Sequence, residues 1–416
     1  MNHQHARIIL YAIATGVVLG ALMGWYAPQA AVSVKWIGDL FLTALKMLII
    51  PLIFAAVISG VTALGDVRKL GRTGLLTIGY YLVTTGIAVL IGLVVVNLIQ
   101  PGVGISLAGG GLPANVAAKQ DMGATDILFQ IVQPNLIESA VNTQLLPIIL
   151  FAVLLGAALT TVGRKGEQVI DFFAGFNDAM MALVIWLMYA APVGIFALVA
   201  GRLGAAQLEG GFVREVSAVG LHVVTVLSGL AIHFAVLLVI MFVFGRRGWR
   251  YLASLMKALL TAFGTASSSA TLPLTMECAR EEGVDPRAVR FVIPLGSTLN
   301  MNGTALYEAC AAMFIAQAYG VPLGLEHQVI IFITATLAAV GAAGIPEAGL
   351  VTMVIVLRAV GLPLEGIGLL LAVDWFLDRF RTAVNVWGDA VGATVIDRYL
   401  PEVVEDPELR EAAEPT

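Results

Sequence analysis

Charged residues are scarce in this sequence. Only 12% of its 416 residues are Asp, Glu, Lys or Arg, whereas about a quarter of the residues in soluble domains are charged. Hydrophobic residues make up 59% of the chain. They form runs long enough to cross a bilayer as helices, and not the alternating strands of about ten residues that build a membrane barrel. The sequence therefore predicts an all-α multispanning membrane protein.

Cysteine and histidine are also rare. Cys278 and Cys310 are isolated from one another and have no metal-ligand spacing, so we expect neither a disulfide nor thiol catalysis. The five histidines form no metal-binding pattern, and His222 and His233 lie on an apolar stretch where they are predicted to be packing residues. We expect no cofactor and no nucleic-acid partner, but we expect contact with membrane lipid.

Long apolar runs predict six membrane spans, at residues 8–27, 36–64, 74–99, 145–163, 169–201 and 217–245. The connection 100–144 is rich in Gly and Asn and is predicted to lie outside the membrane. The first run is long enough to span, so we expect no cleavable signal peptide. Lys and Arg concentrate in the loops on the side of the N-terminus. This bias predicts cytoplasmic termini and a plasma membrane location, typical of a prokaryotic inner membrane protein.

Three later segments are interrupted by small residues. Residues 251–280 contain GTASSSATLP and have basic residues at both ends, which predicts a re-entrant helical hairpin with its tip at Ser267, Ser268 and Ser269. A second hairpin is predicted at 325–359, where AAVGAAGIPEAG breaks the helix. Between them, the helix 288–319 is interrupted at LGSTLNMNGT. Non-helical backbone at membrane depth must be buried in protein or line a polar cavity, as in inverted-repeat transporters.

The segment DWFLDRFRTAVNVWGD, residues 374–389, is charged although apolar runs flank it. Five charged side chains facing lipid would cost on the order of 12–18 kcal/mol. At 100° per residue, one face of the predicted helix collects the polar side chains. These are Asp374, Asp378, Arg381, Thr382, Asn385 and Asp389. This face is therefore predicted to meet protein, water, ions or substrate.

The polar groups favour an acidic amino acid as the substrate. Half-helix N-termini at the hairpin tips suit a carboxylate, and unwound carbonyl groups suit a hard cation such as sodium. Arg381 can grip a second carboxylate, and Asp378 can neutralise an ammonium group. A C4-dicarboxylate is the close alternative, and an anion channel is the alternative from another class. The serines at the tip have no histidine base nearby, so we do not expect an enzyme.

Glu308 follows the NMNGT segment by about one helical turn, in the apolar context YEACAAMFIA. Burial disfavours the ionised form of a carboxyl group. Glu308 is therefore a candidate proton carrier, and a hydrogen-bonded structural role is the alternative.

Four segments resemble the signatures of the glutamate transporter family, the dicarboxylate/amino-acid:cation symporters. They are SSSATLP, NMNGTALYEACAAMFIAQAYG, GAAGIPEAGLVTMVIVL and DWFLDRFRTAVNVWGD. The family includes archaeal aspartate transporters, bacterial glutamate carriers and excitatory amino-acid transporters. The resemblance covers essentially the whole chain. It implies eight transmembrane helices, two re-entrant hairpins, inverted repeats, a homotrimer and an elevator mechanism.

The resemblance also implies a division of the chain. Residues 1–73 and 100–216 would form a trimerising scaffold, and residues 74–99 and 217–399 a mobile transport domain. The tail 400–416 is acidic, and we expect it to be disordered and cytoplasmic.

Site residues follow from the resemblance motif by motif. Substrate contacts would come from Ser267, Ser268, Ser269, Met301, Thr304, Val340, Gly344, Asp378, Arg381, Thr382 and Asn385. A first cation site would use Gly296, Asn300, Asn385 and Asp389, and a second would use Thr298, Met301, Ala339, Val340 and Ala342. A third would use Tyr81, Thr84, Thr85 and residue 302.

Residue 302 departs from the family pattern. The usual motif is NMDGT, but this chain has Asn302 in place of the aspartate. Losing a negative charge weakens a dehydrated cation site. Glu308, the pair Arg379 and Arg381, and Ala266 before the serines resemble the animal carriers. Our hypothesis is an acidic amino-acid symporter that transports protons, with reduced sodium dependence and potassium counter-transport left open. A sodium-coupled symporter of the same fold is the alternative.

Overall fold

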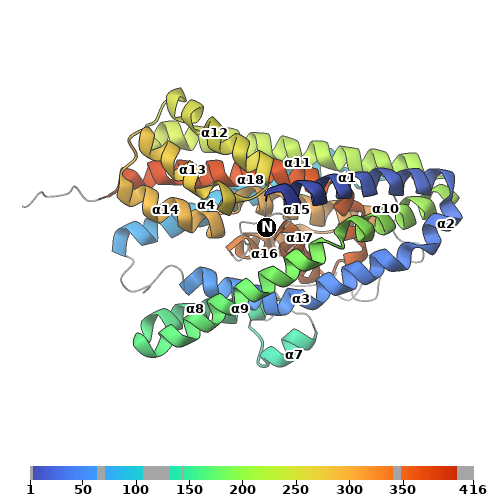
Figure 1. The fold of residues 1–416 in the computed structure, drawn as a ribbon, viewed down its shortest axis with the longest axis horizontal. Helices are drawn as coiled ribbons and strands as arrows, with labels where there is room; N and C mark the ends of the chain where they lie inside the picture. Colours follow the sequence, from blue (N-terminus) through green and yellow to red (C-terminus); the bar gives the residue numbers. More distant parts are fainter. Residues whose placement is uncertain (1–2, 63–70, 106–131, 143–144, 341–347, 401–416) are drawn as a thin grey trace, which may run out of the picture.

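The computed structural model describes residues 3–62, 71–105, 132–142, 145–340 and 348–400. Within these ranges the secondary structure is helical and contains no strand (Figure 1). The predicted all-α fold is therefore confirmed for the described part of the chain. The tail beyond residue 400 lies outside the described residues.

One set of helices comes from the first half of the chain. It comprises α1 (His3–Tyr26), α2 (Pro28–Ser33), α3 (Lys35–Thr62), α7 (Leu136–Val141), α8 (Leu145–Thr161), α9 (Arg164–Met188) and α10 (Ala191–Leu208). Within it, α1 packs along α10, and α3 packs against α8, α9 and α10. In Figure 1, α3, α8 and α9 run side by side in the lower half of the view. The backbones of α1 and α10 come close because α1 has glycines there. A Cβ on Gly16 would lie 2.7 Å from the carbonyl oxygen of Pro192.

The predicted single span 169–201 is wrong, because two helices occupy this stretch. α9 ends at Met188, and α10 begins at Ala191 with Pro192 in its first turn. Proline has no N–H and clashes with the preceding turn, so it fits the first turn of a helix but not the interior. Hydropathy missed the break because the residues around it are apolar.

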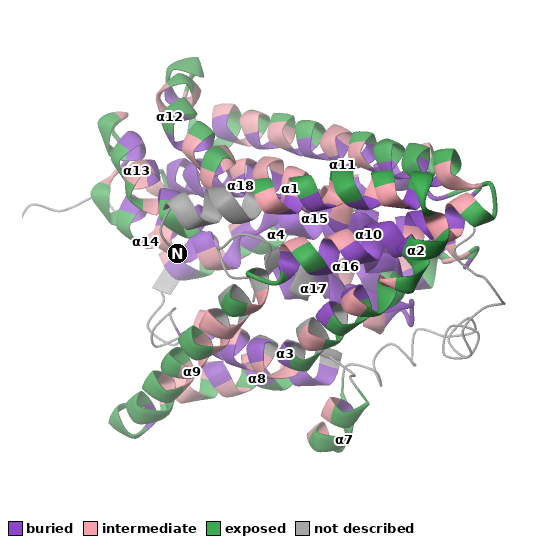
Figure 2. Ribbon diagram, turned by 45° about the vertical axis from the view of Figure 1, so that its right-hand side comes forward, coloured by how far each residue is buried: buried purple, intermediate pink, exposed green. Residues whose placement is uncertain are grey.

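A second set of helices surrounds α18 (Ile367–Asp397), which a short 3-10 turn at Leu364–Gly366 precedes. It comprises α4 (Gly71–Ile99), α11 (Phe212–Ile240) with a π turn at Met241–Gly245, α12 (Trp249–Thr265), α13 (Ser268–Glu281), α14 (Pro286–Leu299), α15 (Asn302–Ala318), α16 (Leu325–Val340) and α17 (Ala348–Ala359). α18 packs against α11, α12, α13, α14 and α15. Figure 2 shows the buried residues concentrated around α15 and α18, whereas α9 shows much exposed surface.

By length and composition, three of the described helical stretches can cross a membrane: Thr73–Ile99, Ala191–Leu208 and Phe212–Gly245. The apolar stretches Tyr11–Tyr26, Ile50–Thr62, Pro147–Thr161 and Leu325–Ala339 are shorter. The total of eight spans stays a prediction.

The predicted helix breaks are confirmed at the first hairpin and at the interrupted helix. α12 ends at Thr265, and Ala266 adopts a left-handed conformation with φ of 49°. The Ser267 hydroxyl then accepts a hydrogen bond from the N–H of Ala270 at 3.2 Å and caps α13. Asn300 and Met301 separate α14 from α15. The predicted turn between α16 and α17, including Ala342 and Gly344, lies outside the described residues.

Candidate functional site

The polar face of α18 is buried, as its periodicity predicts. Each of its six polar residues exposes 6% or less of its surface. Arg381 is fully buried at 0%. A charged group in such a place requires charged or hydrogen-bonding partners.

Arg381 has partners on two edges and on one face. One terminal nitrogen lies 2.9 Å from a carboxylate oxygen of Asp374, and the other donates a hydrogen bond of 2.8 Å to Asp378. The ring of Tyr307 lies under the guanidinium, with its centroid 4.0 Å from the central carbon. Two carboxylates against one guanidinium leave this cluster with a formal charge of minus one.

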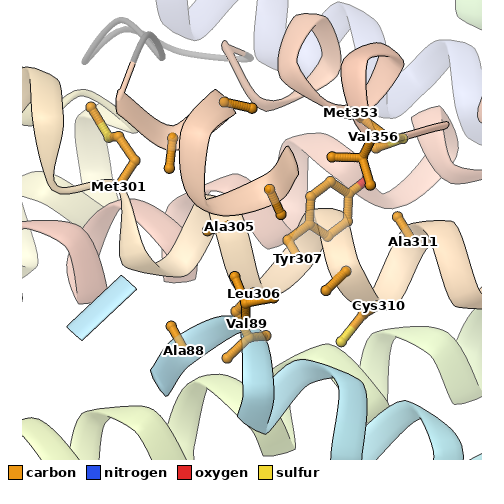
Figure 3. Packing of buried hydrophobic residues seen from close by; sticks show 14 of the residues in the cluster. Ala88, Val89, Met301, Ala305, Leu306, Tyr307, Cys310, Ala311, Met353 and Val356 are labelled. Atoms are coloured by element: carbon orange, nitrogen blue, oxygen red, sulfur yellow. The ribbon is translucent and has the colours of Figure 1, made fainter. Parts of the chain in front are cut away.

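Tyr307 reaches the cluster from α15. Figure 3 shows its ring projecting from α15 on the side where Met353 and Val356 of α17 lie. No local sequence pattern pointed to Tyr307, because the contact depends on how α15 crosses α18. Asp374 was predicted to lie on the polar face, but no role followed from its position. Its separation of seven residues from Arg381, two helical turns, was the usable signal.

Asn385 joins α18 to the start of α15. Its side-chain oxygen accepts a hydrogen bond of 2.7 Å from the N–H of Gly303. Its amide nitrogen lies 3.2 Å from the sulfur of Met301 and 3.4 Å from the hydroxyl of Thr304. Thr382 is buried on the same face. The structure thus brings together the predicted substrate residues of these two helices.

Gly303 sets the spacing between α15 and α18. A Cβ at this position would lie 2.6 Å from the backbone oxygen of Arg381. We expect Gly303→Ala to destabilise the protein by about 1–3 kcal/mol through overpacking. Displacing Arg381 should also weaken substrate binding about tenfold, which corresponds to about 1.4 kcal/mol. Calorimetry and thermal unfolding in detergent measure both effects.

Gly220→Ala on α11 is the matched control, because nothing lies within 4 Å of its added methyl group. We expect it to keep wild-type binding and stability. Equal binding by both variants would contradict the assigned role of Gly303.

Both arms of the first hairpin, α12 and α13, pack against α18. Ser267 and Ser268 are buried, whereas Ser269 is exposed. Arg379 contacts the same hairpin, because it donates hydrogen bonds to the backbone oxygens of Phe263 at 2.9 Å and Gly264 at 3.0 Å. Two arginines two residues apart therefore have different partners: Arg381 pairs with carboxylates and Arg379 holds the end of α12. Sequence reasoning did not predict this role of Arg379.

Glu308 is fully buried on α15. Thr352 of α17 and the charge of Arg381 are close enough to act on its carboxyl group. The salt bridges of the described residues do not include Glu308. A buried carboxyl group without an ion-pair partner is stable in its neutral form, which suits a proton carrier.

The first predicted cation group is assembled. Asn300 donates a hydrogen bond of 2.9 Å to the buried carboxylate of Asp389. Gly296 faces the same carboxylate so closely that a Cβ would overlap it. Hydroxyl groups brace α18 on both sides of Asp389: Tyr80 donates to the Gly388 oxygen at 2.9 Å, and Tyr251 to the Ala390 oxygen at 2.7 Å. A carboxylate among carbonyl and amide oxygens is a donor set that fits a hard cation.

The second predicted cation group is described only in part. The Thr298 hydroxyl donates to the Leu295 oxygen at 3.0 Å, and Met301 is buried next to the helix break. Ala339 is buried at the end of α16, and Val340 is its last residue. Ala342 lies outside the described residues.

The third predicted cation group is also assembled, but its four members include no carboxylate. The Thr85 hydroxyl donates to the side-chain oxygen of Asn302 at 2.7 Å, and the Thr84 hydroxyl lies 3.4 Å from the Asn300 oxygen. Tyr81 is buried and donates to the Val292 oxygen. The amide nitrogen of Asn302 is buried without a hydrogen-bond partner among the described residues. A positive N–H end repels a cation, so these residues fit a third sodium ion poorly.

Known proteins match this chain over nearly its whole length. The profile of the Sodium:dicarboxylate symporter family matches residues 9–399. An excitatory amino acid transporter of Caenorhabditis elegans is 38% identical, covering 94% of this chain and 88% of the relative. Excitatory amino acid transporter 3 is 38% identical in Oryctolagus cuniculus and 37% in Homo sapiens, with 95% of this chain and 85% of each relative covered. The chain therefore belongs to the sodium:dicarboxylate symporter family, and it is a transporter and not an enzyme.

Proposed function

We propose that this protein is a secondary active symporter of acidic amino acids, glutamate or aspartate. The observation that carries the proposal is the fully buried Arg381 with Asp378 2.8 Å away. The side-chain carboxylate of the substrate would replace Asp378 on one edge of the guanidinium, and Asp378 would turn to the substrate ammonium group. Asp374 would stay on the other edge and keep Arg381 oriented. The names of the animal relatives support the same substrate class.

The main-chain carboxylate would bind at the first hairpin tip. α13 begins at Ser268, so its free N–H groups and partial positive charge are available there. Ser267 and Ser269 would add hydroxyl groups. Met301, Thr304, Thr382 and Asn385 would complete the pocket, and the second hairpin from Val340 to Gly344 would cover it.

A C4-dicarboxylate remains the second candidate, because the family description names dicarboxylates. Such a substrate has no ammonium group, so Asp378 would face a second negative charge without compensation. Aspartate should therefore compete for uptake far better than succinate. An anion channel, the candidate from another class, would show conductance without substrate accumulation.

Protons are the proposed coupling ion, with reduced sodium dependence. Glu308 supports proton transport because it is buried and belongs to none of the ion pairs of the described residues. Asn302 supports reduced sodium dependence because it removes the carboxylate from the third group. The family description supports sodium as a co-substrate, and the group around Asp389 is where we place it. Protons and sodium are cargo, and we propose no resident cofactor.

Proteoliposomes test this coupling. With an inward proton gradient and no sodium, we expect the protein to accumulate aspartate, and we expect Glu308→Gln to accumulate much less. The reason is that glutamine has nearly the same shape but cannot carry the proton. No accumulation under the proton gradient, together with full accumulation under a sodium gradient alone, would contradict proton coupling.

The architecture proposed for transport is a homotrimer in the plasma membrane with cytoplasmic termini. The helices α1 to α3 and α7 to α10 would form the scaffold, and α4 with α11 to α18 the transport domain. The packing of the two helix sets supports this division, since α18 makes most of its contacts within its own set. We propose that the second set moves across the membrane as a unit.

A further inference from the structure

His222 is a fully buried polar residue that the proposed function does not use. It lies on α11 with 0% of its surface exposed. Its ring centroid is 4.8 Å from that of Phe314 and 6.1 Å from that of Tyr307. Both aromatic residues belong to α15, so the imidazole lies in the contact between α11 and α15.

Neither ring nitrogen of His222 has a hydrogen-bond partner among the described residues. A neutral imidazole carries one N–H donor and one acceptor, and burying both without partners is unfavourable. Phenylalanine or leucine would fill an apolar contact without this cost. An imidazole in this place therefore indicates a role that needs its nitrogens, and a proton is the smallest ligand they can take.

Tyr307 connects His222 to the substrate site. The Tyr307 ring neighbours both the imidazole, 6.1 Å away between centroids, and the guanidinium of Arg381, which is 4.0 Å from the ring centroid. When a substrate carboxylate changes the net charge around Arg381, this change therefore acts on the nearby imidazole.

The other ionisable groups on the helices packed against α11 have neighbouring groups with which they interact. On α18, Asp374 and Asp378 pair with Arg381, and on α10, Arg202 pairs with Glu215 of α11. Further along α18, Asp389 accepts from Asn300, Arg379 donates to the Phe263 and Gly264 oxygens, and Asp397 pairs with Arg247. On α15 and α4 lie Glu308 beside Thr352, Cys310, which donates to the Gly92 oxygen, and Tyr80 and Tyr81, which donate to the Gly388 and Val292 oxygens. His222 is therefore the unpartnered imidazole next to the Arg381 cluster.

We propose that His222 is a second proton-binding group of the substrate site, in addition to Glu308, and that it takes up its proton when the acidic amino acid binds. This inference rests on the proposed function. The cluster of Asp374, Asp378 and Arg381 carries a charge of minus one, and an acidic amino acid adds another. A proton from solution on the free lone pair of the imidazole offsets one of these charges, and it leaves again when the substrate is released. No bond within the substrate changes.

Proton and substrate binding must then strengthen each other equally, because linkage is reciprocal. For the wild-type protein we expect aspartate affinity to rise as the pH falls from 7.5 to 5.5. We expect this gain in affinity to be about fivefold smaller in His222→Gln than in the wild-type protein, at the lower end of typical coupling energies. Both carboxyl groups of aspartate stay ionised throughout this range. The pH dependence of the affinity therefore comes from groups of the protein.

The direct test measures proton uptake by purified protein in weak buffer, with a pH-indicator dye, as aspartate is added. Calorimetry under the same conditions records the heat of aspartate binding. We expect Glu308→Gln to still take up protons when aspartate binds. We expect His222→Gln to take up fewer than wild type, and the double variant to take up none. His233→Gln is the matched control. His233 is also fully buried on α11 with nitrogens that have no partner among the described residues, but it lies eleven residues from His222, about 16 Å along the helix axis. It should keep wild-type proton uptake.

Two results would overturn the inference while the symport function stands. One is that Glu308→Gln binds aspartate, as its binding heat shows, but takes up no protons. This result does not depend on whether a His222 variant folds. The other is equal proton uptake by His222→Gln and wild type. No aspartate heat from the wild-type protein would contradict the proposed function itself, and the inference would fall with it.

Discussion

Replacing Arg381 with alanine is expected to reduce uptake of aspartate and glutamate at least a hundredfold, a loss of about 2.7 kcal/mol or more. The guanidinium is fully buried and already holds two carboxylates at 2.8 and 2.9 Å. Without it, the side-chain carboxylate of the substrate would enter a buried site that has no positive partner, and hydrogen bonds to charged groups contribute about 1.5–3 kcal/mol each. A neutral amino acid such as serine does not need this partner, so we expect its uptake to persist or to appear.

The stability of the variant must be separated from its substrate preference. Removing Arg381 leaves Asp374 and Asp378 buried without a counterion, and breaking a buried pair costs about 3–5 kcal/mol. Asp374→Asn in the same chain removes one of these charges. Radiolabelled aspartate and serine uptake, with thermal unfolding in detergent, are the measurements for both the single and the double variant. Unchanged aspartate uptake in a folded Arg381 variant would remove the basis of the proposed function.

Arg379→Ala is the control for arginine removal near the site. Arg379 donates to the backbone oxygens of Phe263 and Gly264, and not to a carboxylate of α18. Its loss should disturb the tip of the first hairpin and slow uptake. It should not change the class of substrate, because Arg381 remains. Aspartate should still be preferred over serine.

The different roles of these two arginines show where sequence reasoning reaches its limit. A period of 3.6 residues was enough to place Arg381, Asp378 and Asp374 on one buried face, because a helix fixes these relations locally. Tyr307 belongs to another helix, and its contact depends on the close approach at Gly303. No local pattern carries that information. The partners of Arg379 were missed for the same reason, since they lie 115 and 116 residues away in the chain.

Some helix breaks could likewise be predicted from the sequence, and one could not. The breaks at Ala266 and Asn300 were predictable, because small and polar residues interrupt apolar runs there. The break between α9 and α10 was missed, because the chain stays apolar through it and Pro192 was the only local signal. The ligand sets of the cation sites came from the resemblance to a family. The structure assembles those near Asp389 and Asn302, but sequence spacing alone does not place α4 beside α15.

Asn302→Asp is expected to make substrate binding depend on sodium, at a site whose present residues fit a cation poorly. In the present structure the Thr85 hydroxyl donates to the Asn302 oxygen at 2.7 Å, and the Asn302 amide nitrogen is buried without a partner. Aspartate at 302 replaces this N–H donor with a carboxylate oxygen, which adds a negative charge and a ligand suited to a hard cation. Buried without a cation, that charge would be costly, so sodium binding and substrate binding become coupled.

The coupling predicts the sign and size of the effect. Without sodium, Asn302→Asp should bind aspartate about tenfold more weakly than wild type, and saturating sodium should restore the affinity, within the usual range of coupling energies. Calorimetric titrations at several sodium concentrations measure this dependence, with choline as the replacement cation. Asn97→Asp makes the same chemical change on α4, where the asparagine donates to Gln328 at 2.9 Å and lies about 18 Å along the helix axis from Thr85, the partner of Asn302. It should leave the sodium dependence unchanged. If Asn302→Asp shows the same sodium dependence as wild type, restoring the charge has not restored a sodium site. The neutral amide is then not the reason for reduced sodium coupling.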